Sequence, residues 1–215
     1  MDRNRIPVAV DGIPYAVVSG FVTILLYLFD WTIPAILFSV LTLFIIWFFR
    51  NPERRVPGGN NVVISPADGK IIDISEGVEG RILKKKMVRI SIFMNIFNVH
   101  VNRIPCSGKI SGIFYNHGKF ISANRDKASL ENEQNAVLLE TSNGDNILFV
   151  QIAGLIARRI VCWLKKGDNV EKGQRFGLIK FGSRVDVYLP DGVDIKVSLG
   201  EKVKAGESVL AFLKR

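Results

Sequence analysis

The chain has 215 residues, of which 48% are hydrophobic and 23% are charged, and its formal net charge is +9. This length allows one domain of ordinary size, or one domain with an appendage. Its two cysteines, Cys106 and Cys162, have no metal-ligand spacing and are too few for a disulfide framework, which indicates free thiols in a reducing compartment and no metal site.

Residues 13–49 form an apolar stretch whose only formal charge is Asp30. Asp30 divides it into two segments, each close to the roughly 20 residues that a helix needs to cross a bilayer. A cleaved signal peptide would have one short apolar core, so the pattern predicts a retained transmembrane helical hairpin over residues 1–50; a hairpin that dips into one leaflet is the other alternative. Arginines flank the hairpin at both ends, and because positive flanks stay in the cytoplasm, the rest of the chain is expected on the cytoplasmic face of the cell membrane.

The remaining positive charge fits this location, because basic surface near a membrane is attracted to anionic headgroups by roughly 1 kcal/mol per well-placed Lys or Arg. The charge is densest over residues 81–89. A solvated loop explains this cluster equally well, whereas nucleic acid is not the expected partner of an anchored protein.

Residues 51–215 consist of short runs of β-type composition separated by Gly, Pro, Asn and Asp. Helical periodicity is weak, with short turns of helix expected near residues 127–134 and 156–167. Residues 165–179 and 198–212 share a pattern of Gly, charged residue, Val, Lys and Gly before an apolar run. They resemble the half-repeats of biotinyl and lipoyl carrier domains, although the lysine that such carriers modify is missing. We therefore predict a mostly β fold, with a barrel-sandwich catalytic domain over residues 51–215 that follows the hairpin.

Three residues are candidates for chemistry, although each has a structural explanation by itself. Asp68 lies in a predicted turn, which its side chain alone could stabilise. His100, one of two histidines, lies in a predicted strand with polar neighbours and could be a surface histidine. Ser183 follows Gly182, where a glycine bulge would explain the pair. Together a serine, a histidine and an aspartate can act as nucleophile, base and orienting group.

The surroundings of Ser183 differ from those of an ordinary serine hydrolase, because the Gly-x-Ser-x-Gly elbow is missing. The nearest electrophile to the Ser183 hydroxyl is the carbonyl of Gly182. A base that removes the hydroxyl proton would allow attack on the bond between these residues, and glycine leaves the carbonyl sterically open. The pair therefore predicts a self-cleavage site.

Five motifs occur in order along the chain: FFRNPERRVP (48–57), SPADGKI (65–71), NIFNVHVNRIP (95–105), DKASLENEQN (126–135) and FGSRVDVYLP (181–190). With these motifs, residues 48–215 resemble phosphatidylserine decarboxylases of the short prokaryotic type. The resemblance implies a pyruvoyl-dependent carboxy-lyase that converts phosphatidylserine in the membrane to phosphatidylethanolamine and carbon dioxide through a Schiff base. It also implies attack of Ser183 on Gly182, cleavage into a β subunit (1–182) and an α subunit (183–215), and conversion of Ser183 into the pyruvoyl cofactor.

Two motifs depart from those of larger family members. Leu-Gly-Ser-Thr is replaced by Phe-Gly-Ser-Arg, and His-x-x-His-x-Pro by His-x-x-Arg-x-Pro. The resemblance implies that His100 donates the proton in decarboxylation, and Arg103 occupies the position of the second histidine, which assists cleavage. Whether His100 serves both steps stays open. Asp68 is expected to orient His100, and Arg103 is a candidate for substrate binding.

Two other functions fit the sequence. The substrate could be a related lipid with a serine headgroup, such as archaetidylserine, or the chain could lack decarboxylase activity. In the second case it could be a membrane-anchored adaptor in which Ser183 is never processed, or a protein that cleaves itself without decarboxylating a lipid. The resemblance leaves the oligomeric state open and is compatible with a homo-oligomer.

Overall fold

The computed structural model describes residues 6–118, 132–154, 159–180 and 183–214. The chain forms two compact units, Met1–Glu53 and Arg54–Arg215. Asn51 belongs to the first unit, because its backbone N–H donates to the Pro7 carbonyl at 2.6 Å and its side-chain amide donates to the Ile6 carbonyl at 3.1 Å.

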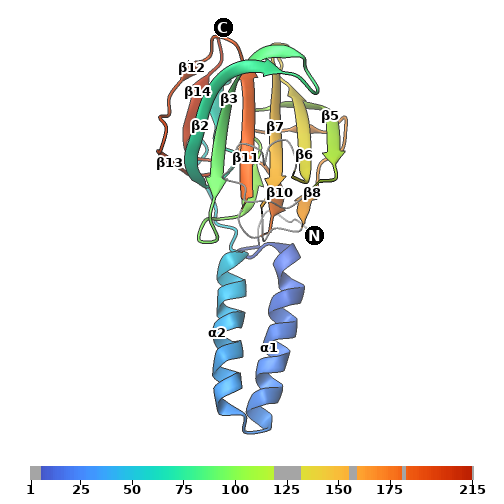
Figure 1. The fold of residues 1–215 in the computed structure, drawn as a ribbon, viewed down its shortest axis with the longest axis vertical. Coiled ribbons are helices and arrows are strands. Elements are labelled where there is room, and N and C mark those ends of the chain that lie inside the picture. Colours follow the sequence, from blue (N-terminus) through green and yellow to red (C-terminus); the bar gives the residue numbers. More distant parts are fainter. Residues whose placement is uncertain (1–5, 119–131, 155–158, 181–182, 215) are drawn as a thin grey trace. The chain divides into compact units, whose positions relative to one another are not determined.

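The first unit is a pair of antiparallel apolar helices, α1 (Ile13–Leu28) and α2 (Thr32–Phe48), preceded by a short 3-10 helix, η1 (Val10–Gly12) (Figure 1). The chain reverses at Asp30, whose φ of 58° is the left-handed conformation found in tight turns. Ser19 Oγ and Thr42 Oγ1 are 2.8 Å apart, so hydroxyl groups of the two helices satisfy each other.

The outward faces of this helical pair are apolar. Residues Val10–Leu28 are long and apolar enough to cross a membrane, with a mean hydropathy of 1.6, and α2 is a shorter apolar helix. Side chains such as Leu28 and Ile33 are more than 70% exposed. Helices that are apolar on all sides require a nonpolar environment, so this unit has the character of a membrane-associated segment.

The second unit is built from strands. In the described part of the chain these are β1 (Val62–Ile64), β2 (Gly69–Glu79), β3 (Lys85–Met94), β4 (Val101–Arg103), β5 (Gly108–Asn116), β6 (Gln134–Glu140), β7 (Asn146–Ala153), β8 (Ile160–Cys162), β9 (Asn169–Val170), β10 (Arg175–Ile179), β11 (Ser183–Pro190), β12 (Asp194–Ile195), β13 (Lys202–Val203) and β14 (Val209–Phe212). The helical turn expected near residues 156–167 is wrong where β8 lies, because pairing with β10 outweighs a weak local pattern.

The strands form three antiparallel sheets. The largest has the order β13-β2-β3-β11-β7-β6-β5-β9, and two smaller sheets have the orders β4-β10-β8 and β1-β14-β12. Strand β11 lies in the large sheet between β3 and β7. Strands β13 and β14, near the C-terminus, pair with β2 and β1. The C-terminal segment is therefore interleaved with strands from the start of the unit.

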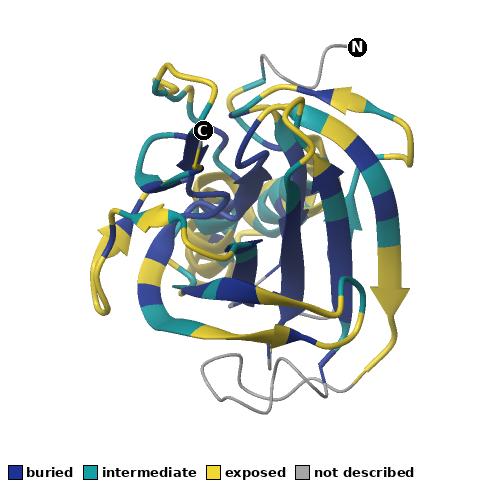
Figure 2. Ribbon diagram, turned by 90° about the horizontal axis from the view of Figure 1, so that it is seen from above, coloured by how far each residue is buried: buried dark blue, intermediate teal, exposed yellow. Residues whose placement is uncertain are grey.

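One hydrophobic core contains residues of all three sheets, and Figure 2 shows its buried strands enclosed by the curled large sheet. Val185 of β11, Phe176 of β10 and Leu210 of β14 all have no exposed surface. The rings of Phe149 and Phe176 meet edge to face with centroids 5.0 Å apart. The predicted fold class, a mostly β sandwich that follows apolar helices in the chain, is confirmed.

The two similar C-terminal segments share one local structure. In each, a two-residue strand, β9 or β13, is followed by a turn and then by β10 or β14. Gly173 and Gly206 occupy equivalent positions in these turns, with φ values of 82° and 80°. Glycine reaches such values without steric cost, so the repeated sequence pattern reflects two turns of the same geometry.

Candidate active site

Ser183 is the first residue of β11, and in the ladder it lies between Met94 of β3 and Ala153 of β7. Its side chain is fully buried, and its hydroxyl donates to the Met94 sulfur at 3.3 Å. A thioether is a weak acceptor, so the hydroxyl proton stays available to a stronger base. Gly182, the predicted partner in cleavage, lies outside the described residues.

His100 lies directly before β4 and is 3% exposed. The expectation of a histidine on a polar strand surface is wrong, because the chain forms a turn over residues 95–98, where the Asn98 N–H donates to the Asn95 carbonyl at 3.0 Å, and the strand begins only at Val101. At the end of β10, Ile179 donates its N–H to the His100 carbonyl at 3.4 Å. This contact places His100 beside the strand that immediately precedes Ser183 in the sequence.

The His100 ring has a defined tautomer. Its Nδ1 lies 2.9 Å from the Asn98 carbonyl oxygen. A carbonyl can only accept, so we assign the proton of the neutral ring to Nδ1 and the lone pair to Nε2. The Nε2 atom is shielded from solvent. The imidazole can therefore take up a proton at a buried nitrogen.

The Asp68 carboxylate lies in the turn before β2 and contacts the C-terminal segment. Arg54 Nη2 donates to its two oxygens at 3.2 and 3.0 Å, and the backbone N–H of Ala205 donates to Oδ1 at 2.8 Å. Arg54 also donates to Glu207 at 3.4 Å. Asp68 thus braces the segment between β13 and β14, while a backbone carbonyl holds the Nδ1 atom of His100.

Arg103, the last residue of β4, is buried and braces a second loop. Its Nη1 donates to the Gly173 carbonyl at 2.9 Å, and its backbone N–H donates to the Pro66 carbonyl at 2.9 Å. A guanidinium does not lose its proton in proteins, so Arg103 cannot replace a histidine as a base.

Three buried carboxamides near this site were missed in the sequence. Asn135 Nδ2 donates to Gln151 Oε1 at 3.0 Å, and Gln151 Nε2 donates to Asn102 Oδ1 at 2.9 Å. Asn102 Nδ2 then contacts the Met94 sulfur at 3.8 Å, the atom to which Ser183 also donates. Amides at inward positions of apolar strands, such as Gln151 in NILFVQIAG, are the signal that could have identified them.

Arg184, where larger family members have threonine, forms a buried ion pair on the other face of β11. Its Nε and Nη2 donate to the Asp186 carboxylate at 2.5 and 3.0 Å, and Nη2 also donates to Ser91 Oγ at 2.9 Å. Both charged side chains are at most 1% exposed. Such a bidentate pair satisfies the guanidinium inside the protein, so this departure from the family pattern has a structural explanation.

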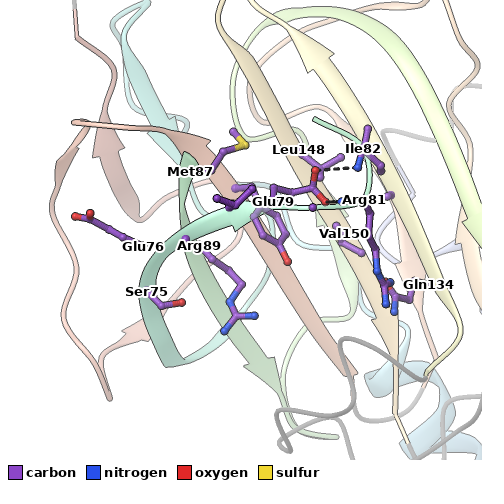
Figure 3. A pocket seen from close by; sticks show the side chains of 15 residues that line it. Ser75, Glu76, Glu79, Arg81, Ile82, Met87, Arg89, Gln134, Leu148 and Val150 are labelled. Atoms are coloured by element: carbon purple, nitrogen blue, oxygen red, sulfur yellow. Dashed lines mark hydrogen bonds between the residues drawn. The ribbon is translucent and has the colours of Figure 1, made fainter. Parts of the chain in front are cut away.

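A pocket of about 420 Å³ lies on the same outer face, with Leu148 and Val150 among its apolar lining residues (Figure 3). Arg89 and Arg81 also line it. Arg89 donates to Asp73 at 3.0 Å and Arg81 donates to Gln134 at 3.2 Å, so both guanidinium groups bond to the protein itself. None of the site residues predicted from the sequence lines this pocket, and the chemistry is better assigned to the inner face of β11.

Neither a metal nor a thiol competes with Ser183 in the described ranges. Within them no group of three or more His, Cys, Asp or Glu side chains could hold a metal ion. Cys106 and Cys162 are free, and burial raises the pKa of Cys106 to about 12 and that of Cys162 above its ordinary value. A thiol must ionise to act as a nucleophile, and the raised pKa values disfavour the thiolate form of both cysteines.

Comparison with known proteins identifies the family. The family model for phosphatidylserine decarboxylase matches residues 41–211. The phosphatidylserine decarboxylase proenzyme of Geotalea uraniireducens (strain Rf4) is 49% identical over 213 residues, which cover 99% of this chain and 100% of the relative. The proenzyme of Syntrophus aciditrophicus (strain SB) is 52% identical over 206 residues, 94% of this chain and 96% of the relative, and that of Syntrophotalea carbinolica is 50% identical over 214 residues, 100% of both.

The β sandwich and these full-length matches place this protein in the class of carboxy-lyases that are made as proenzymes. The chain belongs to the phosphatidylserine decarboxylase family. The resemblance found in the sequence motifs is confirmed.

Proposed function

We propose that this protein decarboxylates phosphatidylserine to phosphatidylethanolamine and carbon dioxide, with a pyruvoyl group made from Ser183 by cleavage of the Gly182–Ser183 bond. The observation that carries the proposal is the burial of Ser183 at the start of β11, where its hydroxyl contacts the Met94 sulfur that Asn102 of β4 also approaches. Relatives named as proenzymes, which match this chain over its length, support it.

His100 is the base for cleavage in this proposal. Its Nε2 takes the hydroxyl proton of Ser183, and Oγ attacks the carbonyl carbon that is bonded to the Ser183 nitrogen. A C–O bond forms, the C–N bond breaks and the nitrogen receives the proton, so residues 1–182 are held as an ester. Loss of the α-proton of residue 183 then expels the carboxylate of Gly182, and one water molecule releases ammonia and leaves the ketone. The burial of Ser183 favours this elimination, because it limits hydrolysis of the ester by bulk water.

The surroundings of residue 183 fit a neutral ketone. The side chain contacts the Met94 thioether, and the main chain is held between β3 and β7. The pyruvoyl group supplies an electron sink for the charge left when carbon dioxide departs. His100 is also our candidate for the proton donor, because imidazole is the side chain that most often acts as a general acid or base in enzymes.

The α subunit, residues 183–215, is expected to stay bound after cleavage. Strand β11 lies between two β-subunit strands, and β13 and β14 pair with β2 and β1. The contacts of Asp68 with Ala205 and of Arg54 with Glu207 also join the two subunits.

The helical hairpin is proposed to cross the cell membrane and to keep the β unit on the cytoplasmic face. The apolar outer surfaces of α1 and α2 and the arginines at both ends of the hairpin support this topology. In inverted membrane vesicles, external protease should digest the β unit, whereas right-side-out vesicles should protect it. Digestion only from the periplasmic side would contradict the topology.

Intact mass and carbon dioxide release test the proposed function. The parent chain should yield an α fragment that starts at residue 183 with a blocked N-terminus. Ser183→Ala should stay one chain and release no carbon dioxide, because it lacks the attacking oxygen. Ser91→Ala is a matched control, since Ser91 is also fully buried in the same sheet, and it should still cleave. A parent chain that stays uncleaved in folded form would overturn the proposal.

A further inference from the structure

A chain of three buried carboxamides leads across the core to the Met94 sulfur beside Ser183. It starts at Asn135 of β6, continues through Gln151 of β7 and ends at Asn102 of β4, with donor–acceptor distances of 3.0 and 2.9 Å. All three side chains are at most 2% exposed. Burial of an amide costs roughly 1–3 kcal/mol when its hydrogen bonds are incomplete, so a row of amides in an apolar core calls for a functional explanation.

The direction of the hydrogen bonds along this row of amides is determined by the surrounding atoms. Asn102 Nδ2 faces the Pro66 carbonyl at 3.5 Å and the Met94 sulfur at 3.8 Å, and both atoms are acceptors. The flipped amide would turn an acceptor toward these two acceptors and a donor toward the Gln151 amino group, so the observed orientation is favoured. Gln151 and Asn102 therefore each accept on one side and donate on the other, which strengthens the final donor cooperatively.

The final donor has only weak acceptors in the described part of the chain. A distance of 3.5 Å to Pro66 exceeds the usual range of about 2.7–3.2 Å for N–H···O bonds, and a thioether accepts weakly. Asn102 Nδ2 and the Ser183 hydroxyl approach the same sulfur, at 3.8 and 3.3 Å. A strengthened donor is thus held, incompletely bonded, at the sulfur that the nucleophile also contacts.

We propose that Asn102 stabilises the oxyanion of self-cleavage, with Gln151 and Asn135 as positioning residues. This inference rests on the proposed function. When Ser183 Oγ attacks the carbonyl carbon of Gly182, the oxygen of that carbonyl receives the electron pair of the C=O bond. Asn102 Nδ2 donates to that oxygen until the C–N bond breaks and the carbonyl re-forms. A donor that lacks a strong acceptor in the resting chain gains one only in the transition state, which is the condition for catalysis by differential binding.

The rate of self-cleavage of the full chain tests this role. The chain is made by cell-free synthesis in the presence of detergent micelles. Asn102→Ala should cleave roughly 100-fold more slowly than the parent, the usual effect of removing one oxyanion donor. Gln151→Met keeps the size of the side chain but releases Asn102, and should slow cleavage roughly tenfold as a partial loss of the same effect. The same variants in the uncleavable Ser183→Ala chain give the shift in melting temperature without interference from processing.

Leu139→Ala is the control for lost stability, because Leu139 is fully buried in the same core but contacts none of the amides through hydrogen bonds. It should lower the melting temperature and leave the cleavage rate of the folded chain near that of the parent. The double variant Asn102→Ala with Gln151→Met should cleave at the same rate as Asn102→Ala alone, since Gln151 acts through Asn102, although both substitutions lower stability.

The outcomes separate the two proposals. A parent chain that cleaves, together with folded Asn102→Ala that cleaves within fivefold of its rate, would overturn the oxyanion role and leave the proposed function intact. If Asn102→Ala does not fold, Gln151→Met decides: a folded chain that cleaves at the parent rate overturns the role. A parent chain that does not cleave overturns the proposed function itself.

Discussion

At the scale of single residues, the site has a histidine that is oriented by the main chain. The Asn98 carbonyl lies 2.9 Å from His100 Nδ1, so the base does not depend on a carboxylate for its tautomer. The position that is histidine in larger family members is Arg103, which braces the loop at Gly173 and cannot act as a base. Both observations support His100 as the proposed group for proton transfer.

His100→Ala should therefore remain a single chain, because the proposed mechanism has His100 take the Ser183 proton. A denaturing gel of the purified protein after long incubation measures cleavage. His117→Ala is the matched control, since His117 is exposed, and it should cleave like the parent. A His100→Ala chain that matures normally but releases no carbon dioxide would restrict His100 to decarboxylation.

Asp68 is expected to act mainly on stability. Asp68→Asn removes the charge partner of Arg54, and breaking a largely buried ion pair costs about 3 kcal/mol. Urea unfolding in the Ser183→Ala background should show this loss. If stability is unchanged while cleavage stops in the Ser183 chain, Asp68 instead acts directly on the chemistry.

At the scale of elements, the turn after β2 is held by one carboxylate. Glu79 accepts hydrogen bonds from the backbone N–H groups of Arg81, Ile82 and Leu83 at 2.9, 2.9 and 2.6 Å. Burial by itself raises the pKa of Glu79, but the backbone donors together outweigh it and lower the pKa below its ordinary value. The folded state therefore favours the ionised form.

Acid should weaken this turn. Because the folded-state pKa of Glu79 lies below the unfolded value of about 4.3, its contribution is complete above that pH and is lost as pH falls through the folded-state pKa. Glu79→Gln should lower the free energy of unfolding by about 1–2 kcal/mol at pH 7 and by less at pH 3.5. Urea titrations at both pH values measure the difference. Glu76→Gln, at an exposed position of the same strand, should change stability little; equal losses for both variants at pH 7 would contradict the role of Glu79.

At the scale of the whole molecule, the proposed cleavage point divides the chain in sequence but not in structure. Strand β11 fills the space between β3 and β7, and β13 and β14 extend sheets that begin before the cleavage point. Core residues of this segment, such as Val187 and Leu210, are fully buried. Separation of the subunits would expose this core, so cleavage is compatible with an intact fold.

The cleaved subunits should therefore elute together in native gel filtration and in native mass spectrometry, and should separate only in denaturant. A mixture of the separately synthesised fragments 1–182 and 183–215 serves as a comparison, since these fragments must first pair their strands in the correct register. Loss of the α fragment from the freshly cleaved protein on simple dilution would contradict the interleaved structure.

Local chemistry was sufficient to predict the apolar helices and the mostly β unit. Apolar segments as long as a bilayer and period-two patterns are properties of neighbouring residues, which the sequence displays directly. By contrast, burial of His100, the contacts of Asp68 with Arg54 and Ala205, and the row of Asn135, Gln151 and Asn102 depend on strand order. These residues meet only because β4 packs across the core from β7 and because the C-terminal segment returns to β2, and such long-range pairings leave no periodic signal in the sequence around each residue.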